Sequence, residues 1–122
     1  MSIPLRMLIL EDRPSDAELM LHELKKADYD PIFRRVETRE DFLTYLDPSL
    51  EVILADYSMP QFDALLALAL LQEKGFDIPF IVVTGAIGDE TAIECMKQGA
   101  SDYLLKDRMA RLGMLFRFGI LT

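Results

Sequence analysis

The stretch EVILADYSMPQ, residues 51–61, decides the predicted fold because it joins a buried strand to a charged residue. Its apolar run over residues 52–55 is typical of a strand that is buried on both faces. The run ends at Asp56, and the turn-forming Pro60 follows shortly afterwards. A charged side chain is unusual at the end of a buried strand, so neighbouring residues must make this position favourable for Asp56.

The same pattern occurs earlier in the chain, in RMLILEDRP at residues 6–14. There the apolar run leads directly into Glu11 and Asp12. Two strands that end in acidic residues indicate one shared site, formed by Glu11, Asp12 and Asp56.

Length and composition limit the classes of protein to be considered. A chain of 122 residues fits a single domain with its own core, so we interpret residues 1–122 as one domain. The hydrophobic content of 51% and the formal net charge of -8 are typical of a soluble globular protein. Such a charge argues against nucleic-acid binding by this chain, which would require a basic patch.

The single cysteine, Cys95, excludes an internal disulfide and favours a reducing, cytoplasmic location. We expect Cys95 to be a packing residue. No apolar run approaches the ~20 residues that a membrane-spanning helix needs, so no membrane segment is predicted. The apolar start of the chain is interpreted as a first strand and not as a signal peptide.

Apolar runs alternate with stretches of helical periodicity along most of the chain, a pattern that predicts an α/β protein with a parallel sheet. The expected order is (βα)5, in a doubly wound sheet with strand order 2-1-3-4-5. The predicted strands are Leu5–Leu10, Ile32–Val36, Val52–Ala55, Phe80–Thr84 and Asp102–Leu105.

Helix signals occur between these strands. The pair Thr38 and Asp41 has the pattern of a capping box, and Gly75 and Gly99 stand where left-handed C-terminal caps are expected. The predicted helices span residues 14–27, 39–46, 63–74 and 89–98.

The fifth helix is less well defined by the sequence. The segment DRMARLGMLFRFGILT, residues 107–122, contains Gly113 and Gly119, and each lowers helix stability by ~1 kcal/mol relative to alanine. One alternative is a short amphipathic helix that covers the last face of the sheet, and we favour it. The other is a truncated end whose apolar residues are covered by another chain. Those apolar residues are Leu115, Phe116, Phe118 and Ile120.

The strand order explains why the acidic residues would meet. In a doubly wound sheet, strands 1 and 3 are neighbours where the winding reverses, and ligands bind beyond the C-terminal strand ends at that point. Glu11 and Asp12 leave strand 1 there, and Asp56 leaves strand 3. Three converging carboxylates repel one another, and Mg²⁺ is a cation that suits such oxygen ligands.

Two further groups are expected at the same edge. Thr84 ends the fourth strand, and Lys106 follows the fifth. A hydroxyl and an ammonium group are suitable ligands for a phosphate. Each of these features is common when it stands alone, since a strand-end acid is more often a helix cap and a lone lysine is usually solvated. Their combination indicates a phosphoryl site.

At these positions the sequence resembles the receiver domain of bacterial two-component response regulators, over about residues 5–112. The matching motifs are LILED (8–12), ILADYSMP (53–60), IPFIVVTGA (78–86) and GASDYLLKD (99–107). The segment 78–107 is most similar to receivers attached to multidomain sensory kinases. The resemblance implies a flavodoxin-like fold and a phosphorylatable signalling domain.

The resemblance also implies a role for each site residue. Asp56 would accept a phosphoryl group from a phosphohistidine. Asp12, Asp56 and the backbone carbonyl of Ser58 would bind Mg²⁺, with Glu11 acting through a water molecule.

On the other side of the site, Lys106 and Thr84 would contact phosphoryl oxygens, and Tyr103 would be the switch aromatic that turns inward as Thr84 moves. The implied donor is a histidine kinase or a histidine phosphotransfer protein. The output would be a domain or partner protein outside this chain, and dimerisation is possible. Such a domain is not an enzyme with a separate substrate, although it assists its own phosphorylation and dephosphorylation.

Besides the glycine-interrupted segment in place of the usual fifth helix, the sequence departs from the family pattern at two loops of the site. Receivers usually carry a proline after the lysine, commonly joined by a cis peptide. Asp107 stands here instead, and a cis peptide before a residue other than proline is costly, so a trans peptide is the alternative at this position. The turn after Asp56 often ends in glycine, whereas this chain has Gln61 and Ala64. We expect a changed loop shape without loss of the acceptor chemistry.

Two alternative functions remain. One is a pseudo-receiver, a binding module that keeps the fold and signals without phosphorylation. The other is a phosphoaspartyl phosphatase of the haloacid dehalogenase type, which requires a second aspartate two residues after the nucleophile. Ser58 occupies that position here and disfavours the phosphatase.

Overall fold

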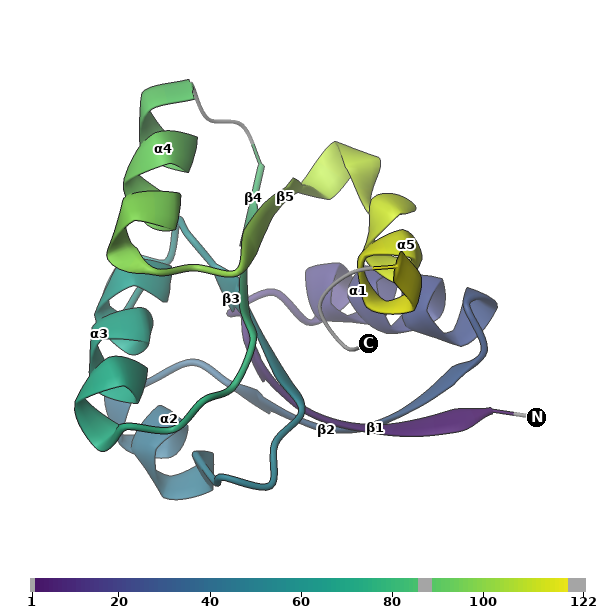
Figure 1. The fold of residues 1–122 in the computed structure, drawn as a ribbon, viewed down its shortest axis with the longest axis horizontal. Helices are drawn as coiled ribbons and strands as arrows, with labels where there is room; N and C mark the ends of the chain where they lie inside the picture. Colours follow the sequence, from purple (N-terminus) through teal and green to yellow (C-terminus); the bar gives the residue numbers. More distant parts are fainter. Residues whose placement is uncertain (1, 86–88, 119–122) are drawn as a thin grey trace.

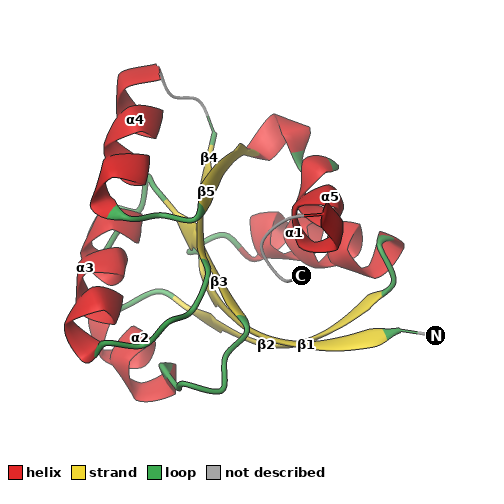
Figure 2. Ribbon diagram, in the orientation of Figure 1, coloured by secondary structure: helices red, strands yellow, loops and turns green. Residues whose placement is uncertain are grey.

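The computed structural model describes residues 2–85 and 89–118, which form a central sheet between two layers of helices (Figures 1 and 2). All neighbouring strands run parallel, in the order β2-β1-β3-β4-β5, as predicted. The strands are β1 (Ile3–Leu10), β2 (Tyr29–Val36), β3 (Val52–Asp56), β4 (Phe80–Thr84) and β5 (Asp102–Leu105).

The helices divide into two groups. Figure 1 shows α1 and α5 on one face of the sheet and α2, α3 and α4 on the other, so the sheet is wound in both directions from β1. This is the predicted flavodoxin-like arrangement. The helices are α1 (Pro14–Lys26), α2 (Arg39–Tyr45), α3 (Ala64–Lys74), α4 (Asp89–Gln98) and α5 (Arg111–Phe118), and the 3-10 helix η1 (Lys106–Arg108) precedes α5.

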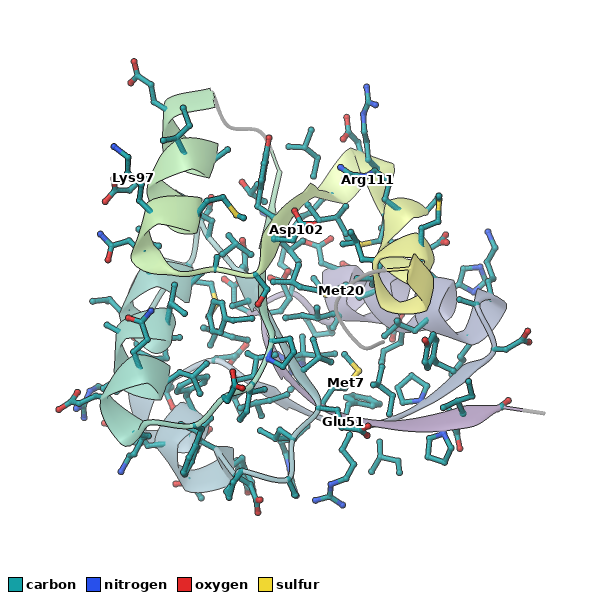
Figure 3. All side chains as sticks on the ribbon, in the orientation of Figure 1. Met7, Met20, Glu51, Lys97, Asp102 and Arg111 are labelled. Atoms are coloured by element: carbon teal, nitrogen blue, oxygen red, sulfur yellow. The ribbon has the colours of Figure 1, made fainter. Side chains whose placement is uncertain are left out.

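Two hydrophobic cores hold these layers together. Alternate residues of β1 point to opposite faces, so Leu8 belongs to the core beneath α2, α3 and α4, while Met7 belongs to the core beneath α1 and α5. Met20 of α1 lies in the same core as Met7 (Figure 3). Every residue of β3 is buried, which explains its uninterrupted apolar sequence. Cys95 is buried in the core beneath α2, α3 and α4, which confirms that it is a packing residue as predicted.

The second strand is longer than predicted and begins at Tyr29 instead of Ile32. Its first residues pair with the start of β1, from Ile3 opposite Tyr29 onwards. Pro31, which suggested a boundary in the sequence, is tolerated because β2 is an edge strand and one side of it has no neighbour. The other strand boundaries agree with the prediction to within two residues.

The predicted helix ends have the expected geometry. The Thr38 hydroxyl accepts a hydrogen bond from the backbone N–H of Asp41 at 3.1 Å and so caps α2. Gly75 adopts the left-handed conformation after α3, with φ 75°. The carboxylate of Asp63 caps the start of the same helix by accepting a hydrogen bond from the N–H of Leu66 at 3.1 Å, a cap that was not predicted.

The fifth helix forms as the favoured alternative predicted, in two pieces, η1 and α5. Leu115 is partly buried against the core beneath α1 and α5. The side chains of Phe116 and Phe118, together with the whole of Gly119 and Ile120, lie outside the described residues. No helix in the described part of the chain is long and apolar enough to cross a membrane.

Candidate functional site

The pairing register brings the C-terminal ends of four strands to one edge of the sheet. Leu10 of β1 is opposite Ala55 of β3, so the residues that follow each strand leave the sheet side by side. Asp56 is opposite Val83 of β4, one residue before Thr84. Thr84 in turn is opposite Leu105 of β5. Every residue predicted for the site therefore starts from this edge or from a loop next to it, apart from Tyr103 within β5.

Three carboxylates meet at this edge as the sequence predicted. Carboxylate oxygens of Glu11, Asp12 and Asp56 all lie within 4.8 Å of one another. Glu11 is fully buried and Asp56 is 4% exposed, whereas Asp12 is exposed to solvent. Like charges at such distances are unfavourable unless a cation or a proton neutralises them.

The electrostatic cost falls mainly on Glu11. Burial and the neighbouring Asp56 carboxylate raise the pKa of Glu11 from its ordinary value of 4.5 to about 7, although Lys106 acts in the opposite direction. In this environment Glu11 is stabilised either by binding a proton or by an additional positive charge beside it.

Lys106 supplies the positive charge in the described structure. Its Nζ atom lies 3.0 Å from Oε1 of Glu11 and 3.4 Å from Oδ2 of Asp56. A third carboxylate, that of Asp16, accepts a hydrogen bond from Nζ at 2.7 Å. Burial alone would lower the pKa of Lys106, but the three carboxylates together raise it well above its ordinary value. Lys106 is therefore the cation that faces all three carboxylates.

The loop after β3 holds Asp56 in place. The backbone N–H of Ser58 donates a hydrogen bond to Oδ1 of Asp56 at 3.0 Å, and the N–H of Tyr57 donates to the carbonyl of Val83 at 2.9 Å. Farther along, the side chains of Met59 and Phe62 are buried. The loop is thus anchored by apolar packing on both sides of Pro60 and Gln61, which are exposed.

Two buried polar atoms of the site have no hydrogen-bond partner among the described residues, and they are Oγ1 of Thr84 and Oε1 of Glu11. The Oε1 atom is nevertheless in an ion pair with the ammonium group of Lys106, 3.0 Å away, whereas the Thr84 hydroxyl has no such partner. Leaving a buried hydroxyl unpaired costs about 1–3 kcal/mol, so a group such as the Thr84 hydroxyl is usually satisfied by a ligand, an ion or water. A hard divalent cation with its waters fits the oxygen set of Glu11, Asp12 and Asp56.

Tyr103 lies apart from the acidic group. It is partly buried against the core beneath α2, α3 and α4, and it contributes to an open apolar depression on the surface. Ile93 and Met96 of α4 line the same depression and are 54% and 45% exposed. The ring is therefore near α4, on the face of the sheet that α2, α3 and α4 cover.

Two residues of the site were not predicted. Asp16 belongs to the first turn of α1, and a helix that starts at Pro14 places it at the same sheet edge as Glu11, a signal that was present in the sequence. Arg35 of β2 donates from Nη1 to the backbone carbonyl of Glu11 at 3.0 Å. Nothing in the sequence pattern indicated that contact, because it depends on the register of the edge strand.

The loop that carries Lys106 has a trans peptide before Asp107, since no cis peptide occurs among the described residues. Lys106 still reaches Asp56 from this loop. The absence of the usual proline does not move the ammonium group out of the site.

Comparison with known proteins supports the resemblance to receiver domains. The family model described as the response regulator receiver domain matches residues 7–114. The regulatory protein LuxO of Vibrio cholerae is 32% identical over 101 residues, which is 80% of this chain and 21% of LuxO. The transcriptional regulatory protein CitT of Halalkalibacterium halodurans is 30% identical, over 83% of this chain and 45% of CitT. The chain thus spans less than half the length of these curated relatives.

Solved structures show the same fold at lower sequence identity. A response regulator from Hahella chejuensis superposes with a TM-score of 0.81 and 24% identity, covering 97% of this chain and 96% of the other. The Mn²⁺-bound form of the response regulator Rcp1 superposes with a TM-score of 0.76 and 23% identity, over 98% of this chain and 96% of the other. Because the family model covers nearly the whole sheet and the acidic edge, this chain belongs to the family of response regulator receiver domains.

Proposed function

We propose that this chain is a phosphorylatable signalling domain in which Asp56 accepts a phosphoryl group from a phosphohistidine. The observation that carries the proposal is the position of Asp56, which shares one edge of the sheet with two further carboxylates and lies 3.4 Å from the ammonium group of Lys106. The donor would be a histidine kinase or a histidine phosphotransfer protein. In this role the chain is a phosphoacceptor and not an enzyme that acts on a separate substrate.

The transfer requires mainly alignment and charge neutralisation. A carboxylate oxygen of Asp56 attacks the phosphorus atom, an acyl phosphate forms, and the bond from phosphorus to the histidine nitrogen breaks with its electron pair remaining on that nitrogen. Lys106 and the hydroxyl of Thr84 would each bind a phosphoryl oxygen. Both are present at the site with donor capacity suited to this task.

Asp12, Asp56 and the backbone carbonyl of Ser58 would bind Mg²⁺, and Glu11 would act through a water molecule. When bound, the cation neutralises charge on the acidic residues and on the phosphoryl oxygens. The burial of Glu11 and the spacing of the three carboxylates support this assignment. The Mn²⁺-bound form of Rcp1 is a relative in which a divalent cation was observed.

The signal would leave the site through Thr84 and Tyr103. Movement of the Thr84 hydroxyl toward a phosphoryl oxygen would free space near the sheet edge, and the Tyr103 ring would turn inward. The exposed apolar side chains of Ile93 and Met96 lie beside Tyr103, so their surface would change with the ring. An output domain, a partner protein or a second copy of the chain would detect the change at this surface.

The test is the intact mass of the protein after incubation with Mg²⁺ and acetyl phosphate. We expect a single phosphoryl adduct in the wild-type protein and none in Asp56→Asn. The matched control is Asp77→Asn, which removes the same charge from an exposed loop before β4, at the opposite edge of the sheet. The control should form the adduct as the wild-type protein does.

Other outcomes would favour the alternatives. If the wild-type protein forms no adduct and does not bind beryllofluoride in the presence of Mg²⁺, the pseudo-receiver function replaces the proposal. Continuous hydrolysis of small phosphate esters would instead favour a phosphatase.

A further inference from the structure

Lys106 makes its shortest contact with a residue outside the acidic group that would bind the metal. Its Nζ atom donates a hydrogen bond to Oδ2 of Asp16 at 2.7 Å, compared with 3.4 Å to Oδ2 of Asp56. The contact joins the first turn of α1 to the residue directly after β5. The position of the ammonium group therefore depends on α1 as well as on the phosphoacceptor.

Asp16 is held where it can make this contact. Its backbone N–H donates to the carbonyl of Arg13 at 3.1 Å, and Pro14 begins the helix just before it. The side chains of Lys106 and Asp16 are only 20% and 25% exposed. An ion pair in such partial shelter is screened less than a pair on an open surface.

The backbone around Lys106 does not by itself fix the position of the ammonium group at the end of the side chain. Lys106 begins the short helix η1, whose N-cap residue Leu105 makes no side-chain cap, and the next two residues are exposed. A lysine side chain has several rotatable bonds and carries about 2 kcal/mol of rotamer entropy, so contacts at its tip decide where the charge stays. The recorded contacts of that tip are with Asp16, Glu11 and Asp56.

We propose that Asp16 is a positioning residue for phosphoryl transfer, which holds the ammonium group of Lys106 beside Asp56. The inference rests on the proposed phosphoacceptor function. A lysine ammonium has three N–H donors, and three carboxylates surround it here. The contact with Asp56 is the longest of the three, so the donor directed to Asp56 can pass to a phosphoryl oxygen while Asp16 keeps its own.

The test compares beryllofluoride affinity in the presence of Mg²⁺ among matched variants. We expect Asp16→Asn to bind roughly fivefold more weakly than the wild-type protein, the effect of losing one partly buried ion pair. Asp16→Glu keeps the charge and should recover part of the affinity. Glu18→Gln removes one charge from an exposed position of the same helix and should bind as the wild-type protein does.

A second background separates positioning from a general effect on α1. In Lys106→Ala, the further change Asp16→Asn should not weaken beryllofluoride binding, because no ammonium group remains to be held. An equal loss in both backgrounds would overturn the proposal, since it would show that Asp16 acts without Lys106. Unchanged affinity in Asp16→Asn would overturn it as well.

A third measurement does not depend on phosphoryl chemistry. In the metal-free protein, the side-chain ammonium signal of Lys106 in a ¹H–¹⁵N spectrum should be visible because its protons exchange slowly. It should broaden or vanish in Asp16→Asn and remain in Glu18→Gln, and a signal unaffected by Asp16→Asn would contradict the proposal. If the wild-type protein shows the protected signal but binds no beryllofluoride, the proposed function fails while the contact itself is supported.

Discussion

Gly113 of α5 lies against Ala27 at the end of α1, so closely that a Cβ atom added to Gly113 would come within 2.7 Å of the Cβ atom of Ala27. In the sequence alone, this glycine indicates a weak fifth helix, because glycine has low helix propensity. The structure shows that it allows α1 and α5 to approach each other on one face of the sheet (Figure 1).

Gly113→Ala should therefore destabilise the protein, although alanine is the better helix former. Higher helix propensity would add about 1 kcal/mol to the free energy of unfolding, while overpacking costs about 1–3 kcal/mol. We expect a net loss of about 1 kcal/mol in urea denaturation. In an Ala27→Gly background the obstructing methyl group is gone, so Gly113→Ala should be neutral or stabilising there. An equal loss in both backgrounds would show that the close approach is not the cause.

Thr84→Val should separate stability from function. The buried hydroxyl of Thr84 has no hydrogen-bond partner among the described residues, so replacing it with a methyl group removes an unpaired polar atom. We expect the free energy of unfolding to rise by about 0.5–2 kcal/mol. Beryllofluoride affinity should fall, since the hydroxyl would no longer bind the anion, and Thr84→Ser should retain much of that affinity. A destabilised Thr84→Val variant would mean that the hydroxyl has a partner in the folded protein.

The sequence predicted the residues that follow directly from the strand order. Asp56 and Thr84 end neighbouring strands and Lys106 follows the next one, so a parallel sheet of order 2-1-3-4-5 places all three at one edge without any knowledge of side-chain contacts. Their chemical roles came from the family resemblance and not from their positions alone.

Contacts that depend on packing between distant segments were not predicted. Asp16 and Lys106 are 90 residues apart in the sequence, and their contact requires the actual position of α1 relative to β5. Arg35 reaches the carbonyl of Glu11 only because β2 pairs with β1 from Ile3 onwards. Helical and strand periodicity report which face of an element is buried but not how two elements align.

Asp12→Asn should remove most of the stabilisation that Mg²⁺ gives. A ligand that binds only the folded protein raises the free energy of unfolding, by about 2.7 kcal/mol at a concentration one hundred times its Kd. Asp12 is exposed, so its loss should leave the metal-free protein as stable as before or slightly more stable because carboxylate repulsion is relieved. Thermal denaturation with EDTA and with excess Mg²⁺ measures both effects. The control Asp30→Asn, at an exposed position of β2, should keep the full response to Mg²⁺.

Glu11 should make the stability of the metal-free protein fall as the pH rises. Its pKa is about 7 in the folded protein and near 4.5 when unfolded, so between these values the folded state binds more protons than the unfolded state. The stabilising contribution of protonated Glu11 is complete below the lower value and is lost as the pH rises through the higher one. We expect a loss on the order of 1–3 kcal/mol in denaturation experiments with EDTA from about pH 5 to about pH 8.

Glu11→Gln should lose this part of the pH dependence because glutamine does not titrate, while Glu18→Gln should retain it. Saturating Mg²⁺ should also flatten the dependence in the wild-type protein, since the cation favours ionised Glu11 at every pH. The same slope in Glu11→Gln as in the wild-type protein would assign the titration to another group. A slope of opposite sign that depends on Glu11 would mean that Lys106 dominates over burial and keeps the carboxylate ionised.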